Sequence, residues 1–110
     1  MEPPSSNPAQ PNLTAALDRL WARFLPEIRE RVTVIESAIQ SLAANSLPVE
    51  QKEAAASAAH KLAGVLGTFS LARGTDLARE LELQFTGKLD SVDNLSALVS
   101  ELRAIIEARA

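Results

Sequence analysis

The sequence predicts an all-α protein: an antiparallel up-and-down four-helix bundle with a short additional helix at its N-terminal end. From residue 12 onward, apolar residues recur at spacings of three, four and seven, which is typical of helices with one buried face. No stretch shows the alternation of apolar and polar residues that marks a strand. The expected helices are joined by short connections, so consecutive helices should pack as antiparallel neighbours.

The N-terminal residues have a different composition from the rest of the chain. Residues 1–12 hold four of the six prolines and no large apolar residue after Met1. Such a segment cannot bury enough apolar surface to offset the entropy of ordering it. We therefore expect a disordered, proline-rich arm or interdomain linker over residues 1–11 and a helical bundle domain over residues 12–110.

The first two helices are predicted on either side of Pro26. Asn12 is a suitable N-cap for a short helix, and Pro26 should break the chain because it has no N–H and disfavours helical geometry at Leu25. The apolar positions of the short helix are Leu13, Leu17, Leu20, Trp21 and Phe24, and those of the next are Ile28, Val32, Ile35, Ile39 and Leu42.

Three further helices complete the expected bundle. One starts near Ser46 or Leu47, tolerates Pro48 in its first turn and runs to about Phe69. A connection over residues 70–74 follows. Gly74 or Thr75 should cap the next helix, which buries one face and stops at Gly87. Its apolar positions are Leu77, Ala78, Leu81 and Phe85. Ser91 should cap a last helix, whose apolar positions are Leu95, Leu98, Val99, Leu102, Ile105 and Ile106 and whose Asp93 and Arg109 favour the helix dipole.

Composition narrows the possible functions. The chain has 110 residues, enough for one domain, and its net charge of −3 without a basic stripe gives no support for nucleic-acid binding. It has no cysteine, which excludes disulfides and thiolate metal sites. No apolar run approaches the roughly 20 residues that span a bilayer, and no secretory signal is visible. We expect a cytoplasmic protein that does not bind membranes.

The single histidine, His60, lies on a helix face whose neighbouring side chains are small or absent. The core-facing stripe of this helix collects Ala55, Ala59, Leu62, Leu66 and Phe69. On the other side, His60 is accompanied by Ala56, Gly64 and Gly67. Each glycine inside a helix is less favourable than alanine by about 1 kcal/mol. The glycines indicate either a close helix–helix contact or, as we favour, a surface that lets another protein approach the imidazole.

One histidine limits the chemistry available. Zinc sites and di-metal carboxylate sites need several ligands, and the position three before His60 is Ser57 rather than glutamate. Neither a nucleophile elbow nor a glycine-rich phosphate loop ending in GK[ST] is present. The chain is therefore expected to bind no cofactor and no ATP, and to have no kinase activity of its own. What remains is an exposed histidine that acts as a nucleophile toward a group delivered by a partner.

The run from His60 to Glu82 resembles the histidine-containing phosphotransfer (HPt) domain. The matching residues are His60, Leu62, Gly64 and Gly67, followed by Leu81 and Glu82, against a family signature of H-x-L-K-G and a following helix with Leu-Glu or Leu-Gln. The resemblance implies a phosphorelay carrier, a monomer that exchanges a phosphoryl group with receiver-domain aspartates, with magnesium held by the partner receiver.

The resemblance also assigns roles to individual residues. His60 would be the phospho-acceptor, Gly64 would give the receiver room, and Glu82 would hydrogen-bond the imidazole from the adjacent helix. Gly67 is a further candidate for the docking surface. The family lysine three residues after the histidine is Ala63 here, so Lys61 or Arg79 could substitute for it. Ser70 stands where the family has glycine at the end of the helix, which is tolerable if the backbone there is not left-handed.

Three other functions remain open at the level of sequence. A non-catalytic interaction bundle would make His60 incidental. A histidine-kinase dimerisation domain would place an acidic residue directly after the histidine and a proline soon after, whereas Lys61 follows here and no later proline occurs. The phosphotransfer module of a larger chemotaxis-type kinase would share both fold and histidine. The direction of phosphoryl flow is open in each phosphotransfer case.

Overall fold

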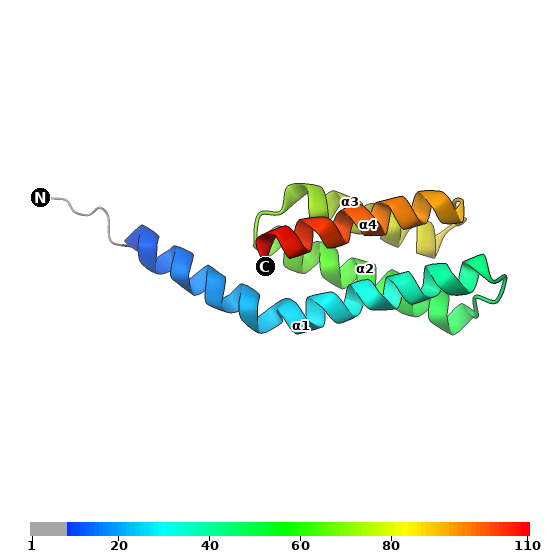
Figure 1. Ribbon diagram of the computed structural model, residues 1–110, viewed down its shortest axis with the longest axis horizontal. Coiled ribbons are helices and arrows are strands. Elements are labelled where there is room, and N and C mark those ends of the chain that lie inside the picture. The colour runs from blue at the N-terminus through cyan, green and yellow to red at the C-terminus, as the bar shows by residue number, and fades with distance from the viewer. Residues whose placement is uncertain (1–8) are drawn as a thin grey trace, which may run out of the picture.

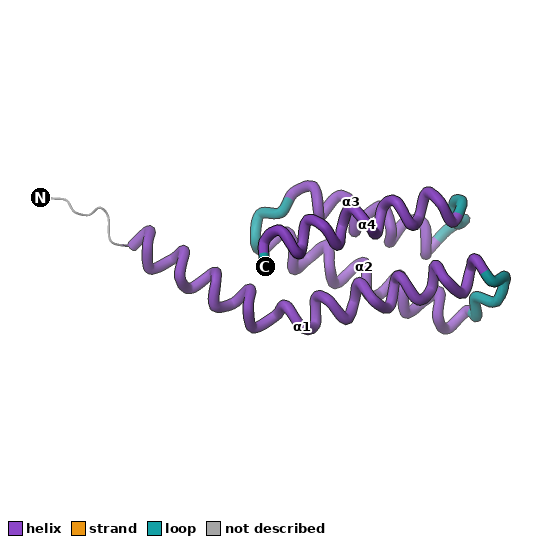
Figure 2. Tube along the Cα trace, viewed as in Figure 1, coloured by secondary structure: helices purple, strands orange, loops and turns teal. Residues whose placement is uncertain are grey.

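The computed structural model describes residues 9–110, which form four helices and no strand (Figure 1). These are α1 (Ala9–Ala43), α2 (Val49–Thr68), α3 (Ala72–Thr86) and α4 (Val92–Arg109). Figure 2 shows that only short loops join them. The prediction of an all-α chain is therefore confirmed. Most of the expected N-terminal arm lies outside the described residues, and because α1 begins at Ala9, Asn12 lies within the helix and does not cap it.

Each helix packs against its neighbours in the sequence, and α4 also contacts α1, which closes a ring of four. The chain reverses direction at every connection, so consecutive helices run antiparallel (Figure 1). The core is made of the apolar faces read from the sequence. Its fully buried large side chains are Ile28, Val32, Ile35, Leu62, Leu66, Leu77, Leu81, Phe85, Leu95, Leu102 and Ile106.

The predicted separate N-terminal helix is wrong, because α1 continues through Pro26. Trp21 is 3% exposed and Ile28 is fully buried, so both sides of the proline are held against the bundle. Pro26 and Ala22 are both exposed, and Pro26 lacks the N–H that would otherwise bond the Ala22 carbonyl. The helix bends in this region, as helices with an internal proline do (Figure 1). Packing on both sides outweighs the local cost of the proline.

The first turns of α1 extend past the C-terminus of α4 (Figure 1). Leu13 and Leu20 are consequently exposed, although the sequence placed them on a buried face. At the point where the bundle ends, Trp21 packs edge-on against Phe69, with ring centroids 5.1 Å apart. The Arg109 guanidinium lies 5.3 Å from the centre of the Trp21 ring, within the range of a cation–π contact.

The helix ends follow the sequence signals at some positions and depart from them at others. Gly87 is the C-cap of α3, and the Ser91 hydroxyl accepts a hydrogen bond from the Asn94 N–H at the start of α4, both as predicted. The N-cap of α2 is Pro48, one or two residues later than expected. Helix α3 begins at Ala72 and already includes Gly74, which was expected in the connection.

Ser70 adopts the left-handed conformation, with φ of 59°. The Leu71 N–H donates to the Leu66 carbonyl at 3.0 Å and the Ser70 N–H donates to the Gly67 carbonyl at 3.1 Å. These two bonds form a Schellman motif that satisfies the last carbonyls of α2. Serine was expected to be tolerable here only if the backbone was not left-handed. The backbone is left-handed, so Ser70 occupies a position at which glycine is favoured.

None of the helices in residues 9–110 combines the length and the apolar composition that a membrane-spanning helix needs.

Candidate functional site

The site is built on the seam between α2 and α3. The side chain of His60, on α2, is 73% exposed, while its neighbours Ala59 and Leu62 are fully buried. Glu82, on α3, follows the fully buried Leu81 and is 31% exposed. The core residues therefore fix both helices and leave these two polar side chains at the outer edge of the seam.

The structure brings His60 and Glu82 into hydrogen-bonding distance. The Nδ1 atom of His60 lies 2.9 Å from Oε2 of Glu82. An ionised carboxylate can only accept hydrogen bonds, so the ring nitrogen facing it must carry the hydrogen. In the neutral imidazole the other nitrogen, Nε2, then bears the free lone pair. The arrangement leaves a nucleophilic nitrogen on an exposed ring whose orientation is set by Glu82.

The surface next to His60 is open at Gly64. A Cβ placed on Gly64 would meet no atom within 4 Å outside its own helix backbone, and one placed on Gly67 would meet only Thr75 Oγ1 at 3.8 Å. A glycine that served close helix packing would have a neighbour at that position. Ala56, which the sequence grouped with these glycines, is instead buried. The open surface thus lies on the C-terminal side of His60 along α2.

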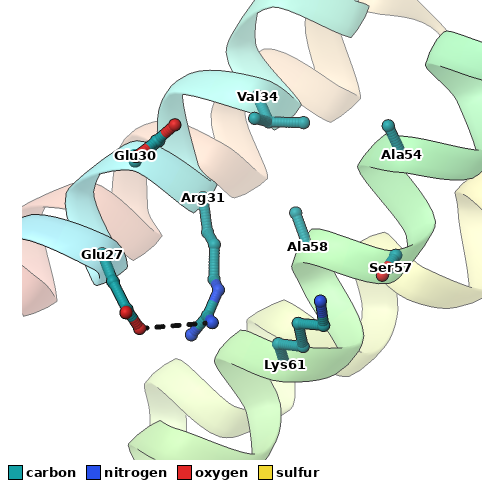
Figure 3. Close-up of a pocket in the computed structure, with 8 residues that line it drawn as sticks. All are labelled: Glu27, Glu30, Arg31, Val34, Ala54, Ser57, Ala58 and Lys61. Atoms are coloured by element: carbon teal, nitrogen blue, oxygen red, sulfur yellow. Dashed lines mark hydrogen bonds and ion pairs between the residues drawn. The ribbon is translucent and has the colours of Figure 1, made fainter. Parts of the chain in front are cut away.

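The two basic residues considered as substitutes for the missing lysine lie on different flanks. Lys61 lines a groove of about 330 Å³ between α1 and α2 (Figure 3). The other residues at this groove are Glu27, Glu30, Arg31, Val34, Ala54, Ser57 and Ala58. Arg79 is exposed on α3, three residues before Glu82. Ala63, at the position of the family lysine, is buried.

Within residues 9–110, no group of three or more histidine, aspartate or glutamate side chains is placed to hold a metal ion. The expectation that the chain itself binds no metal stays a prediction.

Comparison with known proteins identifies the family. Residues 19–110 match the family described as the Hpt domain. This chain belongs to the Hpt domain family. This chain is also 32% identical over 80 residues to Protein RcaC of Microchaete diplosiphon. The match covers 73% of this chain and 12% of that protein. No solved structure matches the chain. The resemblance read from His60 to Glu82 is confirmed, and the family is one of histidine phosphotransfer in two-component signalling.

Sequence reasoning missed two features of this Hpt domain. One is the groove between α1 and α2, although Ala54, Ala58 and Lys61 have the spacing of one helix face and could have indicated a second contact for α2. The other is Gly74, whose Cβ would lie 3.2 Å from Leu66 Cδ1 and 3.4 Å from Ile105 Cγ2. Gly74 therefore permits α3 to pack closely against Leu66 of α2 and Ile105 of α4. Nothing in its local sequence distinguishes it from a loop residue.

Proposed function

We propose that this Hpt domain carries a phosphoryl group between the aspartates of receiver domains, with His60 as the residue that is phosphorylated. The observation that carries the proposal is the exposed imidazole whose Nδ1 is 2.9 Å from the Glu82 carboxylate, beside open space at Gly64. Family membership supports the reaction class.

The transfer is a single displacement at phosphorus. The lone pair of Nε2 forms a bond to the phosphorus of the receiver's acyl phosphate, the bond from phosphorus to the aspartate oxygen breaks, and the aspartate leaves as a carboxylate. The imidazole gains positive charge in this step, and the hydrogen bond from Nδ1–H to Glu82 stabilises it. The reverse transfer uses the same contacts, so the site supports flow in both directions.

Catalysis of phosphoryl transfer depends mainly on alignment and electrostatics, because the transferred group is loosely bonded to both sides in the transition state. The receiver holds the magnesium ion and supplies most of the positive charge. This chain supplies one nucleophile and a docking surface, and it acts as a monomer that neither hydrolyses ATP nor phosphorylates itself. Gly64 serves the approach of the receiver to Nε2.

The test is transfer of radiolabel from a phosphorylated receiver domain. The chain should acquire label that is labile in acid and stable in alkali, as a phosphohistidine is, and His60→Gln should acquire none. Incubation of the chain alone with labelled ATP and magnesium should give no label. Label that persists in His60→Gln, or autophosphorylation of the isolated chain, would refute the proposal.

A further inference from the structure

We propose that Arg79 is the residue of this chain that supplies positive charge to the phosphoryl group carried on His60. The inference rests on the proposed phosphorylation of His60. It names Arg79 as the side chain that would contact the phosphoryl group on His60. It is argued from the register of α2 against α3, from the freedom of the Arg79 guanidinium and from the placement of Lys61.

The register between α2 and α3 follows from two contacts. His60 meets Glu82, and two turns later along α2, Gly67 faces Thr75, which lies two turns earlier along α3. The helices are antiparallel, so the residues midway between these contacts lie opposite one another (Figure 1). On α2 these are Ala63 and Gly64, and on α3 they are Ala78 and Arg79.

Burial separates the inner pair from the outer pair at this level. Ala63 and Ala78 are buried between the helices, whereas Gly64 and Arg79 are exposed. Arg79 therefore stands at the rim of the seam, opposite the open surface at Gly64 and about 4.5 Å along the helix axis from Glu82. A cation here borders the space in which a phosphoryl group on Nε2 would sit.

The guanidinium of Arg79 is not engaged elsewhere in the described part of the chain. Arg29, Arg73 and Arg103 each donate to a glutamate through two nitrogens, and these contacts raise the pKa of all three arginines. Arg79 forms no ion pair with another described residue. A guanidinium is always charged and can donate to phosphate oxygens through two N–H groups.

Lys61 offers a matched comparison. It is as close to His60 in sequence as a residue can be, and it is exposed, but it lies on the α1 side of α2 among Glu27, Glu30 and Arg31 (Figure 3). Glu82 and Arg79 are on the α3 side. The structure therefore predicts that removing the two cations has unequal effects on a phosphoryl group at His60.

The experiment uses the whole chain phosphorylated chemically with phosphoramidate, so no receiver is needed. His60 is the single histidine, and the ³¹P NMR signal of the phosphohistidine is therefore unambiguous. A nearby cation stabilises the dianionic phosphoryl group and lowers its pKa. The pH midpoint of the ³¹P shift should move upward in Arg79→Ala, return toward the wild-type value in Arg79→Lys, and stay unchanged in Lys61→Ala.

Transfer from a phosphorylated receiver gives a second measurement. Loss of a charge-assisted hydrogen bond should slow transfer to Arg79→Ala roughly tenfold, with less than about a twofold change in Lys61→Ala. An unchanged ³¹P midpoint in Arg79→Ala, or an equal shift in Lys61→Ala, would overturn the assignment of Arg79. Failure of the receiver to label the wild-type chain would instead refute the proposed function, and the chemically phosphorylated protein separates the two results.

Discussion

The imidazole of His60 projects from α2 into solvent, and its only hydrogen-bond partner among the described residues is Glu82 on α3. An exposed ring without a partner rotates and exchanges its tautomers freely. The carboxylate fixes both the ring plane and the nitrogen that carries the proton. At the scale of single residues, the proposed function therefore depends on one contact between two helices.

Replacing Glu82 with alanine should slow phosphotransfer to His60 by about tenfold, because the hydrogen bond to Nδ1–H strengthens as the ring gains charge. Helicity measured by circular dichroism should be unchanged, since Glu82 is not part of the core. Glu80→Ala is the matched control, because Glu80 is an exposed carboxylate on the same helix. Its Oε2 accepts a hydrogen bond from Gln84 Nε2 and has no contact with His60 among the described hydrogen bonds. Equal rates in Glu82→Ala and wild type would argue for a surface role of Glu82.

Ser70 carries a backbone cost that a single substitution can remove. Its φ of 59° disfavours any residue with a Cβ, and Ser70→Gly should raise the free energy of unfolding by about 1 kcal/mol in urea titrations. Asn45, two residues beyond the end of α1, has a φ of 56°, but asparagine tolerates this conformation better than serine does. Asn45→Gly should therefore give a smaller gain, and equal gains at both positions would contradict the explanation.

At the scale of elements, two glycines of adjacent helices have opposite surroundings, one open and one tightly packed. Gly64 on α2 has open space where its Cβ would be, while Gly74 on α3 is packed against Leu66 and Ile105. Both are helical, although the sequence predicted a helical position for Gly64 alone and placed Gly74 in a connection. The difference comes from which neighbour each helix face meets.

Glutamine at each position should separate the two roles. Gly64→Gln should keep or raise the melting temperature, because glycine is unfavourable in a helix by about 1 kcal/mol, yet it should obstruct the receiver and reduce transfer. Gly74→Gln should lower the free energy of unfolding by about 2 kcal/mol or more through overpacking. A sharp fall in the melting temperature of Gly64→Gln would show that this glycine serves packing.

At the scale of the whole molecule, ion pairs join the first helix to the last. Arg29 pairs with Glu107, Arg103 with Glu36, and Arg109 with Asp18. The guanidinium of Arg29 lowers the pKa of Glu107 through its hydrogen bonds. The stabilisation from Glu107 is therefore present above the ordinary pKa of a glutamate and is lost as the pH falls through the lowered value.

The Glu36–Arg103 pair should be the most useful of these contacts to measure, because both side chains are about one-third exposed. A double-mutant cycle with Glu36→Gln and Arg103→Met should give a coupling energy of about 0.5–1 kcal/mol that shrinks in high salt. The pair of Arg31 and Glu27, 3.4 Å apart on α1, is the control and should give less. A coupling that does not respond to salt would rule out an electrostatic origin.

The sequence by itself determined most of the core-facing residues after Pro26, the cap at Ser91, the stop at Gly87 and the family, through His60, Gly64 and Glu82. These are local signals: periodicity, a capping hydroxyl and a short motif each depend on residues within a few turns of one another.

Only the tertiary structure decided how the helices meet. It carried α1 through Pro26, because buried Trp21 and Ile28 anchor both sides of the proline. It separated the role of Gly74 from that of Gly64 and set Arg79 opposite the open surface beside His60. The physical reason is common to these cases. A residue's local preference is worth about 1–3 kcal/mol, and the burial and register of residues far apart in the chain decide whether that preference prevails.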